Sequence, residues 1–110
     1  MLPDVTNPRR ESFRRRLYDD RPAGGPTTRT IDAELAPDGS LAVIAQDVGE
    51  APLAAFGDGD YEFWVRVDSE QRAALLLALL AERFGGRFDA VDEFRAWLAA
   101  QGIPGEFHSY

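Results

Sequence analysis

The clearest hydrophobic pattern in the chain is an alternation over residues 61–67. One face of this segment carries Tyr61, Phe63, Val65 and Val67, and the other face carries Glu62, Trp64 and Arg66. Aromatic and β-branched residues dominate it, and such residues pack well on a pleated surface. The pattern predicts a strand over residues 61–67, with its larger apolar set facing a core.

A second alternating region, residues 28–48, predicts a β-hairpin. Its first half places Ile31, Ala33 and Leu35 on one face and polar residues on the other. Residues 37–40 read Pro-Asp-Gly-Ser, which favours a turn because proline presets φ, aspartate bonds locally and glycine tolerates positive φ. Residues 41–48 are apolar on both faces, as is typical of a strand inside a sheet.

The last third of the chain changes to a helical period. A first helix is predicted from a cap at Asp68 or Ser69 to about residue 84, where two glycines end it. Its centre, residues 73–81, is apolar almost all round, which indicates burial on more than one side. A second helix is predicted from near Asp89 to Gly102, and Pro52 is suited to the start of a single helical turn over residues 52–56.

These elements predict an α+β fold in which a small antiparallel sheet, the hairpin plus a third strand, packs on two C-terminal helices. Residues 106–110 are predicted to be extended, as an edge strand. Residues 28–110 are expected to form a single domain. Residues 1–27, rich in arginine, proline and glycine, are expected to be a flexible extension. Within it, Phe13 and Leu17 are four residues apart, which suits a short helix over residues 11–20.

Composition narrows the classes of function. The 110 residues include no cysteine, which excludes disulfide scaffolds, thiolate metal sites and cysteine nucleophiles. The longest apolar run, residues 73–81, is well short of the roughly 18 residues of a membrane span, and the N-terminus has no secretory pattern. We therefore expect a cytoplasmic protein with no membrane partner. The abundance of residues with GC-rich codons indicates a bacterial source.

Charge is distributed unevenly along the chain, whose net charge is −7. Residues 1–29 hold seven arginines and four acids, a sum of +3, whereas residues 30–110 hold five arginines and 15 acids, a sum of −10. An acidic body repels phosphate backbones, so nucleic acid is an unfavoured partner. The alternative is a regulator that contacts nucleic acid through an arginine-rich arm made of Arg9, Arg10, Arg14, Arg15 and Arg16.

Motifs for catalysis or cofactor binding are missing from the sequence. His108 is the single histidine, and no serine lies in a Gly-x-Ser-x-Gly frame. The segment from Asp58 to Glu62 resembles the start of an EF-hand loop, but Phe63 occupies the position that requires glycine. Phosphate-binding glycine motifs are also lacking. We therefore predict no catalytic residue, no metal and no cofactor. A small-ligand or enzymatic domain that uses carboxylates around residues 47–62 is the alternative.

The strongest candidate contact surface combines an acidic segment with a tryptophan. Trp64 lies on the face of the strand opposite the apolar side chains that face the core. If this face is open, Trp64 resembles an interface hot spot; if another part of the chain covers it, Trp64 is a packing residue. The candidate partner-binding residues are Trp64, Glu62, Arg66, Asp58, Asp60, Asp47 and Glu50. They favour a partner with a basic surface. The sequence thus predicts a small acidic non-enzymatic protein-interaction module, with an antitoxin-like, immunity-like or adaptor role.

Overall fold

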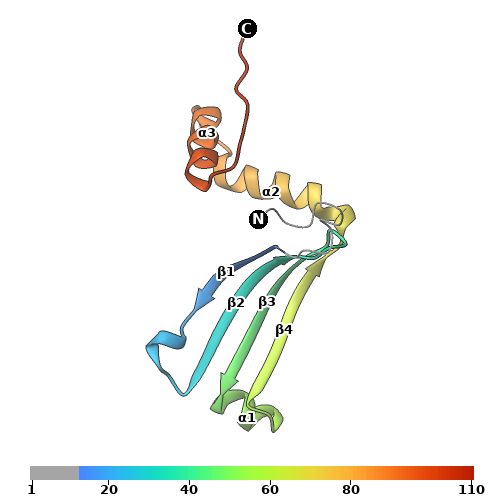
Figure 1. Ribbon diagram of the computed structural model, residues 1–110, viewed down its shortest axis with the longest axis vertical. Helices are drawn as coiled ribbons and strands as arrows, with labels where there is room; N and C mark the ends of the chain where they lie inside the picture. Colours follow the sequence, from blue (N-terminus) through green and yellow to red (C-terminus); the bar gives the residue numbers. More distant parts are fainter. Residues whose placement is uncertain (1–12) are drawn as a thin grey trace, which may run out of the picture. The chain divides into compact units, whose positions relative to one another are not determined.

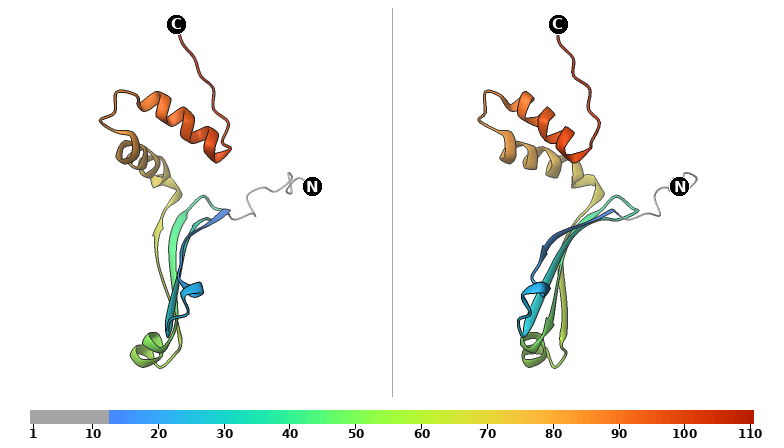
Figure 2. Two further views of the ribbon diagram at one scale, coloured as in Figure 1. Left: turned by 90° about the vertical axis from the view of Figure 1, so that its left-hand side faces the viewer. Right: turned by 60° about the vertical axis from the view of Figure 1, so that its left-hand side comes forward.

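The computed structural model describes residues 13–110. The described residues divide into two compact units, called here the sheet unit, up to residue 72, and the helical unit, residues 73–110. The described part of the sheet unit holds four antiparallel strands in the order β1-β2-β3-β4 (Figure 1). The strands are β1 (Phe13–Asp19), β2 (Thr27–Leu35), β3 (Leu41–Gly49) and β4 (Asp60–Val67). Seen edge-on, the strands form one curved layer (Figure 2).

The predicted hairpin is confirmed as β2 and β3. Ile31 lies opposite Ala45 and Ala33 opposite Val43, and β3 lies inside the sheet between β2 and β4, as its two apolar faces indicate. Asp38 orders the turn, because its carboxylate accepts from the backbone N–H of Ser40 at 2.8 Å and from the Ser40 hydroxyl at 2.6 Å. The local bonding expected of aspartate in this turn is therefore present.

The first strand corrects two expectations. Residues 1–27 are predicted to be a flexible extension with a short helix over residues 11–20, whereas Phe13–Asp19 is a strand paired along its length with β2. A spacing of four residues, as between Phe13 and Leu17, satisfies a helical period and a strand period equally, so the spacing alone misleads. A short 3-10 helix, η2 (Arg21–Ala23), follows β1, and residues 1–12 lie outside the described residues.

A sharp backbone change leads from β3 into the short helix α1 (Glu50–Phe56), at the end of the sheet where β3 joins β4 (Figure 1). Gly49 makes this change with φ of +133°, and a Cβ added to it would lie 2.1 Å from the carbonyl oxygen of Pro26. The Glu50 N–H donates to that same oxygen at 3.1 Å. Pro52 is buried in the helix, which begins two residues earlier than its proline predicts.

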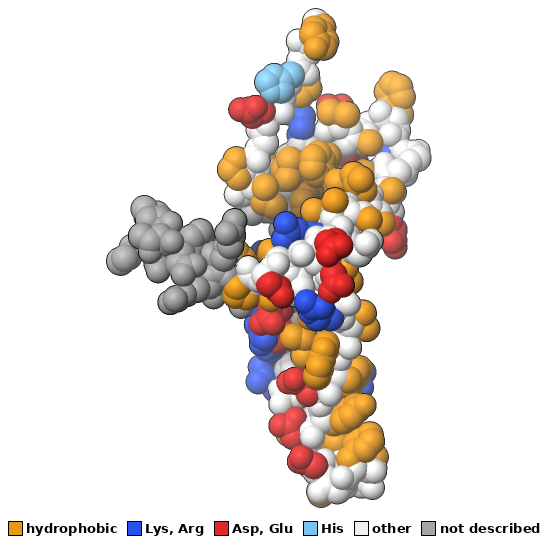
Figure 3. All heavy atoms as spheres, turned by 90° about the vertical axis from the view of Figure 1, so that its right-hand side faces the viewer, with side chains coloured by type: hydrophobic (Ala, Val, Ile, Leu, Met, Phe, Trp, Pro, Cys, Tyr) orange, Lys and Arg blue, Asp and Glu red, His pale blue; other side chains and the backbone are white. Residues whose placement is uncertain are grey.

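The strand register defines two faces of the sheet. The apolar face carries Phe13, Arg15, Tyr18, Arg29, Ile31, Ala33, Leu35, Leu41, Val43, Ala45, Asp47, Tyr61, Phe63, Val65 and Val67. The polar face carries Arg14, Arg16, Asp19, Thr28, Thr30, Asp32, Glu34, Ala42, Ile44, Gln46, Val48, Asp60, Glu62, Trp64 and Arg66. The predicted separation of the Phe63 and Trp64 sides of β4 is thus confirmed. Seen from the β4 side, acidic and hydrophobic side chains form adjacent columns along the sheet (Figure 3).

The helical unit contains the two predicted C-terminal helices, α2 (Arg72–Phe84) and α3 (Ala90–Gln101). A 3-10 turn, η3 (Ser69–Gln71), precedes α2, and Asp68, one of the two predicted cap residues, is the N-cap of this turn but makes no side-chain capping hydrogen bond. Phe84 is buried and meets Phe94 and Trp97 edge to face, with ring centroids 5.6 Å and 6.4 Å away. This aromatic cluster joins the two helices.

One further expectation differs from the structure. Residues 106–110 are extended but form no strand, and the sheet of the described residues ends at β1 and β4. Val65 is exposed in the sheet unit and Leu76 in the helical unit, and packing of the sheet on the two C-terminal helices stays a prediction. Periodicity identifies which residues share a face, but it does not identify what covers that face. Whether residues 28–110 behave as a single domain stays a prediction.

Candidate functional site

The polar face of the sheet is organised by ion pairs between β1 and β2. Arg14 Nη2 donates to Glu34 Oε2 at 2.7 Å, and this carboxylate raises the pKa of Arg14. Arg16 Nε donates to Asp32 Oδ1 at 2.6 Å, and Asp32 is buried. Each arginine lies directly opposite its carboxylate in the strand register. The pairs hold these four side chains against the sheet.

Trp64 lies on this polar face, opposite Ile44 of β3. It is 57% exposed, so most of its indole is accessible in the sheet unit. Glu62 and Arg66 are its neighbours on the same face of β4, because side chains alternate along a strand. The sequence makes Trp64 a candidate contact residue if its face of the strand is open. Within the sheet unit, that face is open.

A shallow hollow of about 250 Å³ lies beside the tryptophan. It is lined by Glu34, Ala36, Ser40, Ala42, Ile44, Glu62, Trp64 and Arg66. Arg66 pairs with Asp68, and its other terminal nitrogen lies 3.4 Å from Asp38. The Ser40 hydroxyl and N–H hold the pKa of Asp38 below its usual range, with Arg66 adding to that effect. The hollow is therefore lined by an indole side chain, two glutamates and an arginine with carboxylate partners.

The predicted acidic residues do not form one patch. Asp60 and Glu62 share the polar face with Trp64, whereas Asp47 lies on the apolar face. Arg29 holds Asp47 there with a 2.5 Å contact, and this hydrogen bond lowers the pKa of the carboxyl. Asp58 lies in the loop before β4, where it accepts from the Asp60 N–H at 3.2 Å, and Glu50 is in the first turn of α1.

Sequence reasoning missed Glu34 and Asp38 as members of the tryptophan site. Both residues belong to the hairpin of β2 and β3, which precedes β4. Glu34 of β2 lies opposite Ala42 of β3, and β3 in turn pairs with β4, the strand of Trp64. The alternation of residues 30–35 places Glu34 on a polar face. Only the order of the strands shows that this face and the polar face of residues 62–66 lie on the same side of one sheet. That order is a property of the folded sheet.

The arginine-rich arm is divided between surfaces. Arg14 and Arg16 are engaged in the ion pairs of the polar face, and Arg16 also reaches Asp19 at 3.0 Å. Arg15 lies on the apolar face. The remaining two arginines of the predicted arm, Arg9 and Arg10, lie outside the described residues.

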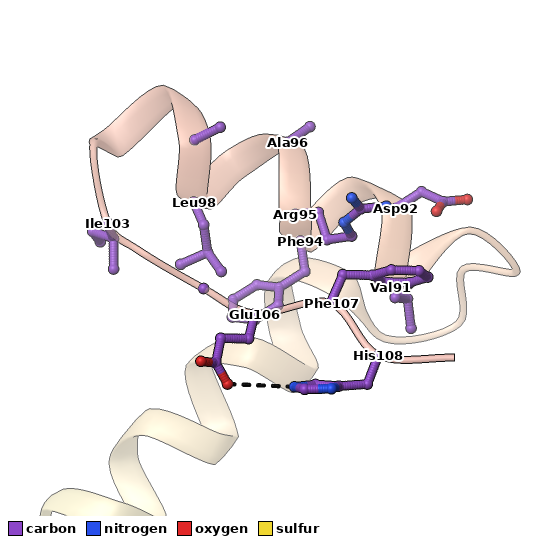
Figure 4. Close-up of a pocket in the computed structure, with 12 residues that line it drawn as sticks. Val91, Asp92, Phe94, Arg95, Ala96, Leu98, Ile103, Glu106, Phe107 and His108 are labelled. Carbon is purple, nitrogen blue, oxygen red and sulfur yellow. Dashed lines mark hydrogen bonds and ion pairs between the residues drawn. The ribbon is translucent and has the colours of Figure 1, made fainter. Parts of the chain in front are cut away.

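The helical unit carries a larger groove of about 960 Å³ between α3 and the C-terminal segment (Figure 4). Val91, Phe94 and Leu98 of α3 line it together with Ile103 and residues 105–108. The Arg95 guanidinium lies 4.1 Å from the centre of the Phe107 ring, which fastens the segment to α3 by a cation–π contact. The side chains of Glu106 and His108 meet at 3.3 Å, and both are exposed.

Neither unit offers a metal centre or a membrane helix in the residues described. Residues 13–110 contain no group of three His, Asp or Glu side chains suited to a metal ion. No helix in that range is long and apolar enough to cross a bilayer. The nearest partner of His108 among the described side chains is a carboxylate on its own segment.

Comparisons of the chain with protein-family models, curated proteins and solved structures gave no match. The class that can be stated is therefore a fold class: residues 13–110 form a small α+β fold with a four-stranded antiparallel sheet and three α-helices, two of them at the C-terminus.

Proposed function

We propose that this chain is a small acidic, non-enzymatic protein-interaction module that binds a partner with a basic surface through Trp64 and the polar face of its sheet. The supporting observation is the exposure of Trp64 beside a hollow that contains Glu34 and Glu62. Tryptophan is enriched at interface hot spots, and its ring face attracts cationic side chains. A lysine or arginine of the partner suits such a hollow.

Electrostatics supports the same kind of partner. On the polar face, three arginines stand against five carboxylates, Asp19, Asp32, Glu34, Asp60 and Glu62, a sum of −2. The remaining part of the chain is also acidic, since the total is −7. A basic partner is attracted by this field, and its association accelerates as ionic strength falls. Antitoxin-like, immunity-like and adaptor roles all depend on such an interface.

The alternative of a nucleic-acid regulator has less support. An arginine that binds phosphate must be free to do so, yet Arg14 and Arg16 are held by carboxylates of β2. The alternative of a carboxylate-based enzyme is also weakened, because the acids of residues 47–62 are spread over both faces of the sheet.

Fluorescence anisotropy with labelled peptides tests the proposal. The probes are two sets of 15-residue peptides of random order and equal hydrophobicity, one rich in Lys and Arg and one neutral. We expect the wild-type protein to bind members of the basic set, and Trp64→Ala to weaken that binding by about tenfold or more. The matched control is Phe88→Ala, since Phe88 is a fully exposed aromatic residue in the other unit. Equal binding of neutral peptides, or equal losses in both variants, contradicts the proposal.

A further inference from the structure

The apolar face of the sheet exposes many large hydrophobic side chains, and the guanidinium of Arg29 lies among them, 5.1 Å from the centre of the Phe63 ring. Five aromatic side chains on it or against it, Phe13, Tyr18, Phe56, Tyr61 and Phe63, are between 38% and 63% exposed. Tyr61 stacks between the other two of its cluster, with centroid distances of 4.4 Å to Phe56 and 5.4 Å to Phe63. At about 150–250 Å² for each aromatic side chain, the exposed parts amount to roughly 500 Å².

Aliphatic side chains extend this surface along the strands. Val65 is 71% exposed, and Val43, its neighbour across β3 and β4, is also exposed. With these side chains the exposed apolar area reaches about 600 Å², the upper end of the largest hydrophobic patch of a typical monomer. This is the small end of specific interfaces, in which each partner contributes about 600–1,000 Å². Its extent therefore suits a small dimer interface.

Charge makes this face suitable for contact between two identical acidic chains. It carries Arg15, Arg29 and Asp47, and the last two neutralise each other in a 2.5 Å ion pair. The face therefore sums to +1, whereas the opposite face sums to −2. Two copies of a chain with a net charge of −7 repel each other least where they meet through this face.

We propose that the apolar face binds the same face of a second copy of this chain. The dimer has twofold symmetry, because one surface patch contacts its own equivalent. The sheet then gains the second layer that an amphipathic sheet needs, at the roughly 10 Å spacing of face-to-face sheets. This surface lies opposite Trp64, so the inference is independent of the proposed function.

Sedimentation equilibrium of the full chain, at protein concentrations from about 1 to 100 µM, tests this proposal. We expect the wild type to dimerise, and Val65→Lys to weaken dimerisation by about 100-fold or more because a charge enters an apolar interface. The matched control is Val48→Lys, which adds the same charge at a 47% exposed valine on the polar face. We expect this control to dimerise like the wild type.

A milder substitution guards against misfolding of the lysine variant. Val65→Thr keeps the β-branched shape and adds one hydroxyl, so we expect an unchanged circular dichroism spectrum and dimerisation weakened by about tenfold. A wild type that stays monomeric over the whole concentration range overturns the proposal. The proposal is also overturned if Val65→Lys lowers the unfolding midpoint of the monomer at every protein concentration. In that case the apolar face is covered within a single chain.

Discussion

Arg16 of β1 lies opposite Asp32 of β2 and donates from Nε to Asp32 Oδ1 at 2.6 Å. Asp32 is buried, whereas Arg16 retains 43% of its side-chain exposure. The pair therefore satisfies a buried carboxylate from a strand at the edge of the sheet. It links a segment that the sequence presents as an arginine-rich extension to the folded sheet.

Removal of this arginine should destabilise the sheet. We expect Arg16→Met to lower the free energy of unfolding by about 1–2 kcal/mol, because Asp32 keeps only the longer 3.5 Å contact to Arg14. Urea denaturation measures the change. Arg21→Met is the control, since Arg21 pairs with Asp19 near the end of β1 and both side chains are solvent-accessible. Equal destabilisation by the two variants would show that the burial of Asp32 is unimportant.

The aromatic cluster of the helical unit yields a second prediction. Phe84 is 7% exposed and meets Phe94 and Trp97 edge to face. We expect Phe84→Ala to cost about 3–5 kcal/mol, since truncating a buried phenylalanine leaves a cavity. Thermal unfolding followed by the loss of helical circular dichroism measures it. Phe88→Ala, at a fully exposed site four residues later, should leave the transition unchanged.

Gly49 provides a third prediction, on the backbone. Its φ of +133° is open to few residues other than glycine, and an added Cβ would collide with the Pro26 carbonyl oxygen. We expect Gly49→Ala to destabilise the chain by more than about 2 kcal/mol. Gly57→Ala should cost only about 1 kcal/mol, because Gly57 has φ of +74° with open space around its Cα. A comparison of the two urea midpoints separates the collision from the φ penalty.

A fourth prediction concerns acid. Arg29 lowers the pKa of Asp47 through its hydrogen bond, and Arg21 lowers that of Asp19. The unfolded chain therefore binds these protons more tightly, so the pairs contribute full stability above the unfolded pKa of about 3.9. That contribution is lost as pH falls through the lower folded values. We expect constant urea midpoints from pH 7 to about 5 and a decline below about pH 4.

The variant Asp47→Asn checks the cause of this decline. It removes one of the groups with a lowered pKa, so its stability should fall less steeply with acid than that of the wild type. The difference should be small, because the Arg29 side chain is 44% exposed and solvent screens the pair. An identical decline in both proteins would assign the acid sensitivity to other carboxylates.

Salt dependence provides a fifth prediction, for the proposed partner interface. Charge reversal with Asp60→Lys should slow association of a basic peptide and flatten its dependence on ionic strength. Stopped-flow measurements at several salt concentrations record the association rate. Asp47→Lys is the control, since Asp47 lies on the opposite face and its reversal changes the net charge equally. An equal effect of both would indicate that net charge governs association.

Most elements were predictable because their signals are local. The alternation of residues 61–67 corresponds to β4, and glycines mark the ends of both C-terminal helices. Asp38 and Gly39 predict their turn through their own backbone preferences. The side of β4 that bears Trp64 follows from the two-residue period of a strand. None of these inferences needs a distant part of the chain.

The sequence by itself determined which residues share a face and where turns and helices end. It also determined that the chain is acidic and that Trp64 lies on the polar face of its strand. Only the tertiary structure decided that Phe13–Asp19 joins the sheet, that Asp47 lies apart from Glu62, and that Glu34 lies in the hollow beside Trp64. The physical reason is that periodicity arises within a segment, whereas register and strand order arise from hydrogen bonds and ion pairs between segments. The pair of Arg16 and Asp32 joins residues 16 positions apart, and no local preference encodes that distance.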